Sequence, residues 1–179
     1  METKALLEKF DLFLVERGLQ FEAVAIGGAA LNLLGIVSRY TRDCDILDPN
    51  IPEAIDEAAR AFATLMRSRG DILNDDWLNN GPESLKKNLS DGWRSRLVSA
   101  FLGRAITLHT LGRPDLLKTK LFALCDRGTD QKDCLSLKPT NAELMEALAW
   151  VADQDVNPEW PKHVRTSFSE LARKLGYEF

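Results

Sequence analysis

The spacing of apolar residues predicts two amphipathic helices in the first half of the chain. Between residues 6 and 14, apolar side chains recur at helical spacing with charged ones on the other side, so we expect a helix that ends near Gly18. A second helix should begin at Pro52 and close at Arg69-Gly70. Its apolar stripe is typical of a helix that covers one face of a sheet: Ile55, Ala58, Ala59, Phe62, Leu65 and Met66.

Between these helices, the pattern changes to short apolar runs. Ala23–Ile26 is too brief for a helix and predicts a buried strand, and Gly27-Gly28 follows it directly before a helix-forming stretch, Ala29–Leu34. Arg39–Leu47 is expected to be extended up to the turn at Asp48-Pro49-Asn50. The order strand, glycine turn, helix, strand is therefore predicted.

The second half begins with a polar segment, residues 71–96, which we expect to be loop with at most short helical pieces. Leu97–Leu102 and Ala105–Leu111 predict a hairpin that extends the sheet, with its turn at Gly103-Arg104. Three helices should follow: Asp115–Asp126, Thr140–Asp153 and Pro158–Leu175. Thr140 with Glu143 matches a capping box, and Asn157-Pro158 matches an N-cap before a first-turn proline.

Together these elements predict an α/β fold with a mixed sheet, flanking helices and a helical C-terminal part. We expect a single domain over residues 1–179, with a sheet-containing core over 1–112 and helices over 113–179. The length is ordinary for one domain with its own hydrophobic core.

Composition narrows the function classes. The net charge of −4 argues against a protein that coats nucleic acid, because such binding needs surplus Lys and Arg. The odd set of three cysteines, Cys44, Cys125 and Cys134, contains no CxxC pair and fits a reducing cytosol. No segment matches a signal peptide or the roughly 20 apolar residues of a membrane span. We expect a cytoplasmic protein with no membrane partner.

The segment from Arg39 to Asp45 carries the most informative side chains. In an extended strand, alternate residues share a face, so Arg39, Thr41, Asp43 and Asp45 should point one way and Cys44 toward the core. Two carboxylates on one face can converge on a cation. Magnesium takes hard oxygen ligands and commonly uses one or two carboxylates plus substrate phosphates, as in a bound nucleoside triphosphate.

The glycine turn supplies a second feature. Without Cβ atoms, Gly27 and Gly28 let the backbone approach a phosphate closely, and the following helix begins with free N–H groups. By itself this turn is more typical of an ordinary strand-to-helix connection, and by itself the Asp43/Asp45 pair is more typical of a solvated strand face. Their combination favours a binding site.

The combination resembles the AbiEii-type and related uncharacterised nucleotidyltransferase-like proteins of the polymerase-β superfamily. The resemblance rests on Gly27-Gly28-x-Ala30-Leu31, Arg39-x-Thr41-x-Asp43-x-Asp45, and Lys120-Leu121-x-Ala123 with Arg127 and Asp130-x-x-Asp133. It implies a nucleotidyltransferase-like fold and metal-dependent transfer of a nucleotidyl group. In several relatives it also implies a toxin role in bacterial toxin–antitoxin or phage-defence systems.

By position, the resemblance implies a role for each matching residue. Asp43 and Asp45 would ligate Mg²⁺ or Mn²⁺, and Gly27 and Gly28 would cradle the phosphates of the NTP. Lys120 would neutralise triphosphate charge. Arg39 and Thr41 complete the nucleotide-binding set, with Arg39 as an assistant to Lys120.

The chain departs from this family at one point. Relatives commonly add a third carboxylate from a neighbouring strand to activate the attacking hydroxyl, and the candidate strand Ala105–Leu111 has none. His109 is the nearest titratable substitute, and Asp133 or Asp91 can fill the place only through folding. The missing third carboxylate puts the expected turnover in question more than the expected fold.

Other candidates have ordinary structural readings. Lys120 lies in an apolar helix and can cover it with its methylene stem, and Asp130 and Asp133 can form a local ion-pair group with Arg127. His109 is more often a satisfied sheet histidine than a catalyst.

Three functional hypotheses follow. The first is a metal-dependent enzyme that moves an NMP from an NTP to a hydroxyl of an RNA, such as tRNA, or of a protein acceptor, with an antitoxin protein as a further partner if it is a toxin. The second is a catalytically weakened relative that acts by binding nucleotide or a partner protein. The third is an inert α/β scaffold in which the Asp pair is incidental.

Overall fold

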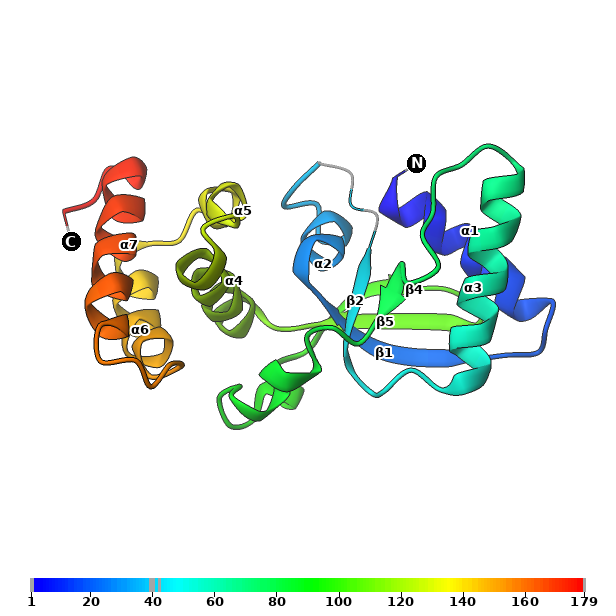
Figure 1. Ribbon diagram of the computed structural model, residues 1–179, viewed down its shortest axis with the longest axis horizontal. Helices are drawn as coiled ribbons and strands as arrows, with labels where there is room; N and C mark the ends of the chain where they lie inside the picture. Colours follow the sequence, from blue (N-terminus) through cyan, green and yellow to red (C-terminus); the bar gives the residue numbers. More distant parts are fainter. Residues whose placement is uncertain (1, 39–40, 42, 179) are drawn as a thin grey trace. The chain divides into compact units, whose positions relative to one another are not determined.

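The computed structural model describes residues 2–38, 41 and 43–178, and the chain divides into two compact units, Met1–Leu111 and Gly112–Phe179 (Figure 1). The first unit contains the sheet and the second is helical. The division falls beside the expected boundary between a sheet-containing core and a helical part. This α/β architecture with a mixed sheet confirms the predicted fold class.

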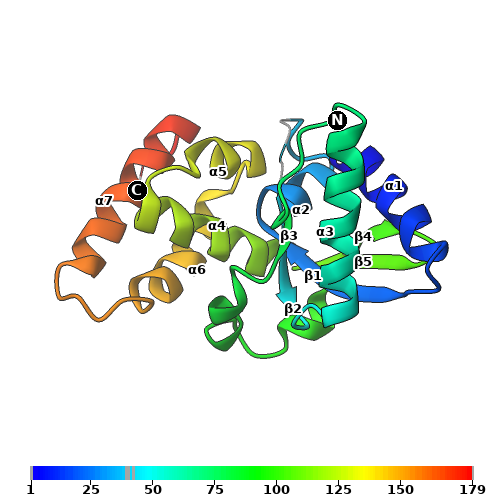
Figure 2. The ribbon, with the colours of Figure 1, turned by 45° about the vertical axis from the view of Figure 1, so that its right-hand side comes forward.

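Five strands form one sheet among the described residues, in the order β3-β2-β1-β5-β4 (Figure 2). Their bounds are β1 Phe21–Ile26, β2 Cys44–Asp48, β3 Leu78–Asn79, β4 Val98–Leu102 and β5 Ile106–Thr110. The central strand β1 runs antiparallel to β2 and parallel to β5. At the edges, β3 is parallel to β2 and β4 is antiparallel to β5. Strand β2 therefore lies between β1 and β3.

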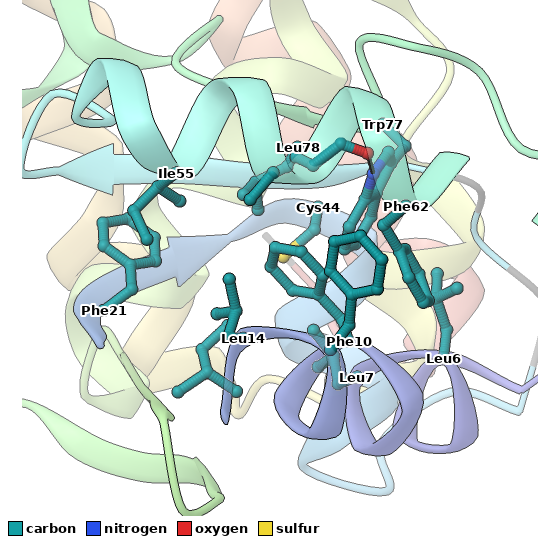
Figure 3. Packing of buried hydrophobic residues seen from close by; sticks show 14 of the residues in the cluster. Leu6, Leu7, Phe10, Leu14, Phe21, Cys44, Ile55, Phe62, Trp77 and Leu78 are labelled. Atoms are coloured by element: carbon teal, nitrogen blue, oxygen red, sulfur yellow. Dashed lines mark hydrogen bonds between the residues drawn. The ribbon is translucent and has the colours of Figure 1, made fainter. Parts of the chain in front are cut away.

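Helices of the first unit bury one face of this sheet. They are α1 Thr3–Val15, α2 Gly27–Leu33 and α3 Glu53–Ser68. Between α1 and α3, the rings of Phe10, Phe62 and Trp77 pack with centroids 5.0 to 5.9 Å apart (Figure 3). The Trp77 indole N–H donates to the Ala59 carbonyl oxygen at 3.1 Å, so its polar atom is satisfied inside the core. Cys44 projects into this same cluster from β2.

A carboxylate of α1 holds the β4–β5 hairpin in place. Asp11 is buried and accepts three backbone hydrogen bonds, from the N–H groups of Arg104 at 3.0 Å, Ala105 at 2.7 Å and Ile106 at 2.9 Å. Burial raises the pKa of this carboxyl, but the three hydrogen bonds outweigh burial and hold the pKa below its ordinary value. The turn at Gly103 packs tightly on Asp11, because a Cβ at Gly103 would overlap the carboxylate. The predicted hairpin is confirmed.

The second unit consists of four helices among the described residues: α4 Arg113–Arg127, α5 Gln131–Leu137, α6 Asn141–Ala152 and α7 Trp160–Leu175. The capping box of α6 is confirmed, since Thr140 Oγ1 accepts from the Glu143 N–H at 3.2 Å and Glu143 Oε2 accepts from the Thr140 N–H at 2.8 Å. Helix α5 was not expected. Helix α7 begins at Trp160, two residues later than predicted, with Glu159 as its N-cap, and the Asn157 side chain accepts from the Glu159 N–H at 3.0 Å in the preceding turn.

Two predictions in the first unit were wrong in detail. Strand β2 begins at Cys44, so Thr41 and Asp43 lie outside it, and residues 39, 40 and 42 of the expected extended segment lie outside the described residues. The polar segment 71–96 holds strand β3 as well as two 3₁₀ helices, η1 Glu83–Lys87 and η2 Trp93–Arg96. None of the described helices has the length and apolar character needed to cross a bilayer.

Candidate functional site

The carboxylate of Asp45 lies against the backbone of Gly27, where β1 passes into α2. Asp45 pairs with Ile26 in the β1–β2 ladder, which brings its side chain beside the next residue along β1. A Cβ built on Gly27 would lie 2.6 Å from Asp45 Oδ2. Gly27 also has φ of +75°, a conformation that L side chains rarely adopt. The backbone conformation therefore favours glycine, and a side chain at position 27 would also displace the Asp45 carboxylate. The predicted glycine turn and one of the two predicted acids, Asp45, lie in contact.

The sheet pleat explains which way Asp45 points. Its neighbour Cys44 and the residue paired with Cys44, Leu78 of β3, both face the hydrophobic core (Figure 3). Because successive side chains in a strand point to opposite faces, Asp45 and its own partner Asn79 share the other face. Asn79 Nδ2 donates to Asp45 Oδ1 at 3.3 Å. One oxygen of Asp45 thus faces Gly27 and the other faces an amide of β3.

The remaining members of the predicted group lie before the strand or outside the described residues. Asp43 and Thr41 precede β2, so they do not share a strand face with Asp45 as predicted. Asp43 is exposed, and the Thr41 hydroxyl donates to the Asp43 carbonyl oxygen at 3.3 Å. Gly28 is half-buried in the first turn of α2. Arg39 lies outside the described residues.

The carboxylate at the end of β2 is engaged by cations of the segment that follows β3. Asp48 Oδ1 lies 2.8 Å from Lys86 Nζ, and Asp48 Oδ2 lies 3.1 Å from an Arg94 guanidinium nitrogen. Burial raises the pKa of this carboxyl, but the two cations outweigh burial and lower the pKa. This ion pair fastens η1 and η2 to β2. Of the two β2 carboxylates, Asp48 is thus engaged in ion pairs with Lys86 and Arg94, and Asp45 is the one that faces the Gly27 backbone.

Cys44 adjoins Asp45 in sequence but has a different chemistry. Its side chain is buried, and burial with the nearby charge of Asp45 raises the pKa of the thiol to about 12. The thiol is therefore protonated at neutral pH and is no nucleophile. All three cysteines are free and buried, which gives each a packing role.

None of the expected substitutes for a third carboxylate lies beside Asp45 on a neighbouring strand. His109 is on β5, which β1 separates from β2, and its Nε2 lies 3.2 Å from Glu22 Oε1. Asp91 is an exposed loop residue, and Asp133 belongs to the second unit.

The strand that flanks β2 on its outer side is β3, and the residue at the register of Asp45 is Asn79. Asn79 was not predicted, because it lies in the polar segment 71–96, whose pattern is typical of a loop. The apolar pair Trp77-Leu78 before the turn-forming Asn80-Gly81 is the local signal there, and two apolar residues are too few to assign a strand.

Lys120 sits in a separate cluster in the second unit. Its ammonium lies 2.8 Å from Asp130 Oδ1 and 2.7 Å from Asp133 Oδ2, and the side chain is 7% exposed. Asp130 also receives a hydrogen bond from Arg127 at 3.2 Å. The ammonium charge is therefore matched by two carboxylates within the same unit. Its predicted contact with a triphosphate stays a prediction.

The place where the Asp45 carboxylate lies against the Gly27 backbone, called the Asp45 corner below, offers carboxylate oxygens as donor atoms. Asp45 is half-buried, and Asp43 precedes it on the exposed side of the strand start. Within residues 2–38, 41 and 43–178, no three His, Cys, Asp or Glu side chains form a group able to hold a metal ion. In proteins, Mg²⁺ commonly binds through one or two carboxylates and takes its other ligands from water and phosphate.

Comparison with models of known protein families gives a match over most of the chain. A family model described as "Nucleotidyltransferase of unknown function (DUF6036)" matches residues 3–174. Searches of curated proteins and of solved structures gave no significant match. The match spans both units and includes every residue of the Asp45 corner.

Proposed function

Because the chain belongs to this family of nucleotidyltransferases of unknown function, we propose that it transfers an NMP from an NTP to a hydroxyl of an RNA or protein acceptor with the help of a divalent metal ion. The observation that carries the proposal is the contact between Asp45 and Gly27. A carboxylate for the cation and a side-chain-free backbone for the phosphates then lie side by side.

The chemistry requires one bond to phosphorus to replace another. The acceptor hydroxyl oxygen forms a bond to the α-phosphorus of the NTP, the bond to pyrophosphate breaks, and the hydroxyl proton leaves to solvent. A bound Mg²⁺ or Mn²⁺ would neutralise the negative charge that develops on the phosphate oxygens.

The protein positions these groups. Asp45, with Asp43 beside the strand start, would hold the cation, and the half-buried backbone at Gly27 and Gly28 would lie along the phosphates.

The finer assignment is also part of this proposal. The resemblance to AbiEii-type proteins of the polymerase-β superfamily supports a toxin role, with tRNA or a protein as acceptor and an antitoxin protein as partner. Arg39, Thr41 and Lys120 complete the nucleotide-binding set in that assignment. For Lys120, this requires an ammonium that can act on phosphate while it is paired with Asp130 and Asp133.

The direct test is transfer of label from α-³²P-NTPs to tRNA or protein in the presence of Mg²⁺. Asp45→Asn keeps the shape of the side chain and removes its charge, so we expect labelling to fall at least about a hundredfold. A matched control is Asp71→Asn, which removes a charge after α3 whose nearest described cation is Lys9 at 4.0 Å. The proposal fails if the native protein labels no acceptor, or if Asp45→Asn labels as well as Asp71→Asn.

One observation favours a second candidate function. The residue beside Asp45 on β3 is an amide, Asn79, where a third carboxylate would assist the attacking hydroxyl. A catalytically weakened protein that binds nucleotide or a partner protein is consistent with this. Calorimetry with NTP and Mg²⁺ separates the two candidates, since tight binding without labelled product supports the second and sustained turnover excludes it.

A further inference from the structure

Asn79 is held in one orientation by two backbone groups. Its Oδ1 accepts from the Gly81 N–H at 2.8 Å, and its Nδ2 donates to the Asp76 carbonyl oxygen at 3.4 Å. A backbone N–H can only donate and a carbonyl can only accept, so the two contacts fix which end of the amide carries oxygen. The NH₂ group consequently faces Asp45 Oδ1.

This orientation places a hydrogen-bond donor where a metal site would use an oxygen ligand. The amide hydrogens offset part of the Asp45 charge and supply no lone pair to a cation. Turning the amide over would bring its oxygen toward Asp45 but would also break the bond from Gly81 and place two oxygens together at Asp76. Asn79 therefore contributes no ligand to the Asp45 corner.

From this geometry we propose that Asn79 is a positioning residue that keeps the Asp45 corner from binding a divalent cation by itself, so that the cation is held only together with the phosphates of a nucleotide. The inference rests on the proposed function, because it concerns the same site. It specifies the order of binding in that function: the substrate enters as a metal–NTP complex, and the protein is metal-free between turnovers.

A carboxylate at position 79 should reverse this property. One of its oxygens would keep the bond from Gly81, and the other would face Asp45 Oδ1 across the distance that the amide now spans, 3.3 Å. Two carboxylate oxygens that close repel each other unless a cation or a proton lies between them. Asn79→Asp is thus expected to create a site for a divalent ion.

The experiment is titration of nucleotide-free protein with Mn²⁺, followed by electron paramagnetic resonance. We expect weak binding for the native protein and affinity at least about tenfold higher for Asn79→Asp, since two carboxylates bind a hard divalent cation better than one. The matched control is Asn74→Asp, which adds the same charge to an exposed position of the same segment and should bind like the native protein.

A double variant tests the mechanism of the gain. Asp45→Asn/Asn79→Asp exchanges the amide and the carboxylate and leaves the net charge as in the native protein, so the gain in Mn²⁺ affinity should disappear. If Asn79→Asp is too unstable to titrate, its unfolding temperature is measured with and without Mn²⁺. Mn²⁺ should raise this temperature in Asn79→Asp and leave it unchanged in Asn74→Asp.

Two results would overturn the inference: tight Mn²⁺ binding by the native protein without nucleotide, or an Asn79→Asp variant that neither gains affinity nor is stabilised by Mn²⁺. These outcomes are independent of the proposed function, because no nucleotide or acceptor is present. If Asn79→Asp gains the metal site and no variant labels an acceptor, the effect of Asn79 on metal binding stands and the transferase proposal fails.

Discussion

Asp45 and Lys120, both charged residues of the proposed site, have different surroundings in the Asp45 corner and in the Lys120 cluster. Asp45 is half-buried, and its carboxylate occupies the space that a side chain on Gly27 would need. Lys120 is buried, and two carboxylates of its own unit lie within 2.8 Å of its ammonium. In the first arrangement a carboxylate lies against half-buried backbone, and in the second the charge of a buried ammonium is compensated within a helical unit. Residue type marks both as candidates, and the burial and ion pairs of Lys120 add a structural role to the one proposed for it.

The largest effect expected from this comparison is on stability. Lys120→Met leaves Asp130 and Asp133 buried without the ammonium between them, and breaking a buried ion pair from one side costs about 3–5 kcal/mol. Urea unfolding should show a loss of that size, whereas Asp45→Asn should lose less than about 1 kcal/mol. If Lys120→Met is as stable as the native protein and loses only nucleotide binding, the Lys120 cluster belongs to the site.

Gly27 allows a prediction that separates backbone strain from the contact with Asp45. Gly27→Ala and Gly35→Ala both place a Cβ at positive φ, +75° and +70°, which costs about 1–2 kcal/mol in each case. Only the Gly27 Cβ meets Asp45, because nothing lies within 4 Å of the Gly35 Cβ position. Calorimetry should show weakened binding of Mg²⁺–ATP in Gly27→Ala alone. Equal binding by both variants would separate Gly27 from the site.

The smallest effect concerns a carboxylate of the second unit that is only partly buried. The hydrogen bond from Arg113 chiefly holds the pKa of Glu143 at about 2, against a partial opposing effect of burial. A carboxyl with a lowered pKa stabilises the fold above its ordinary pKa, near 4.5, and this contribution disappears as the pH falls toward about 2. Glu143→Gln should therefore cost about 1 kcal/mol at pH 7.

Urea unfolding at several pH values checks this prediction. The difference between native protein and Glu143→Gln should shrink as the pH falls below about 5. Glu146→Gln is the matched control, because its carboxylate is 68% exposed and lies 3.6 Å from Lys118 Nζ, so little change is expected. A difference that persists unchanged at pH 3 would contradict the assigned cause.

Elements with strong local patterns were predictable from the sequence. A few neighbouring residues are enough to recognise each of three features: the apolar stripe of α3, the run Ala23–Ile26 before two glycines, and the capping box of α6. Strand β3 was not predictable in this way. It has two residues and depends on pairing with β2, more than thirty positions earlier, so its strand character comes from tertiary contact.

The same distinction between local sequence pattern and tertiary contact applies to the residues of the candidate site. Gly27 and Asp45 were recognisable because their residue types and order are typical of phosphate and metal binding. Their contact follows from the antiparallel pairing of β1 with β2. Asn79 was out of reach because its importance depends on which strand flanks β2, and sheet order is not written in any local pattern. Asp43 was placed on the strand because alternation alone does not say where a strand begins.

The central claim is that Asp45 at the Gly27 corner holds a metal-bound nucleotide. Its most direct test is a titration of native protein and Asp45→Asn with Mn²⁺ and a non-hydrolysable ATP analogue, read by electron paramagnetic resonance. The predicted result is a protein-bound Mn²⁺–nucleotide signal for the native protein and at least about tenfold weaker binding for the variant. Equal binding by the two proteins would contradict the account.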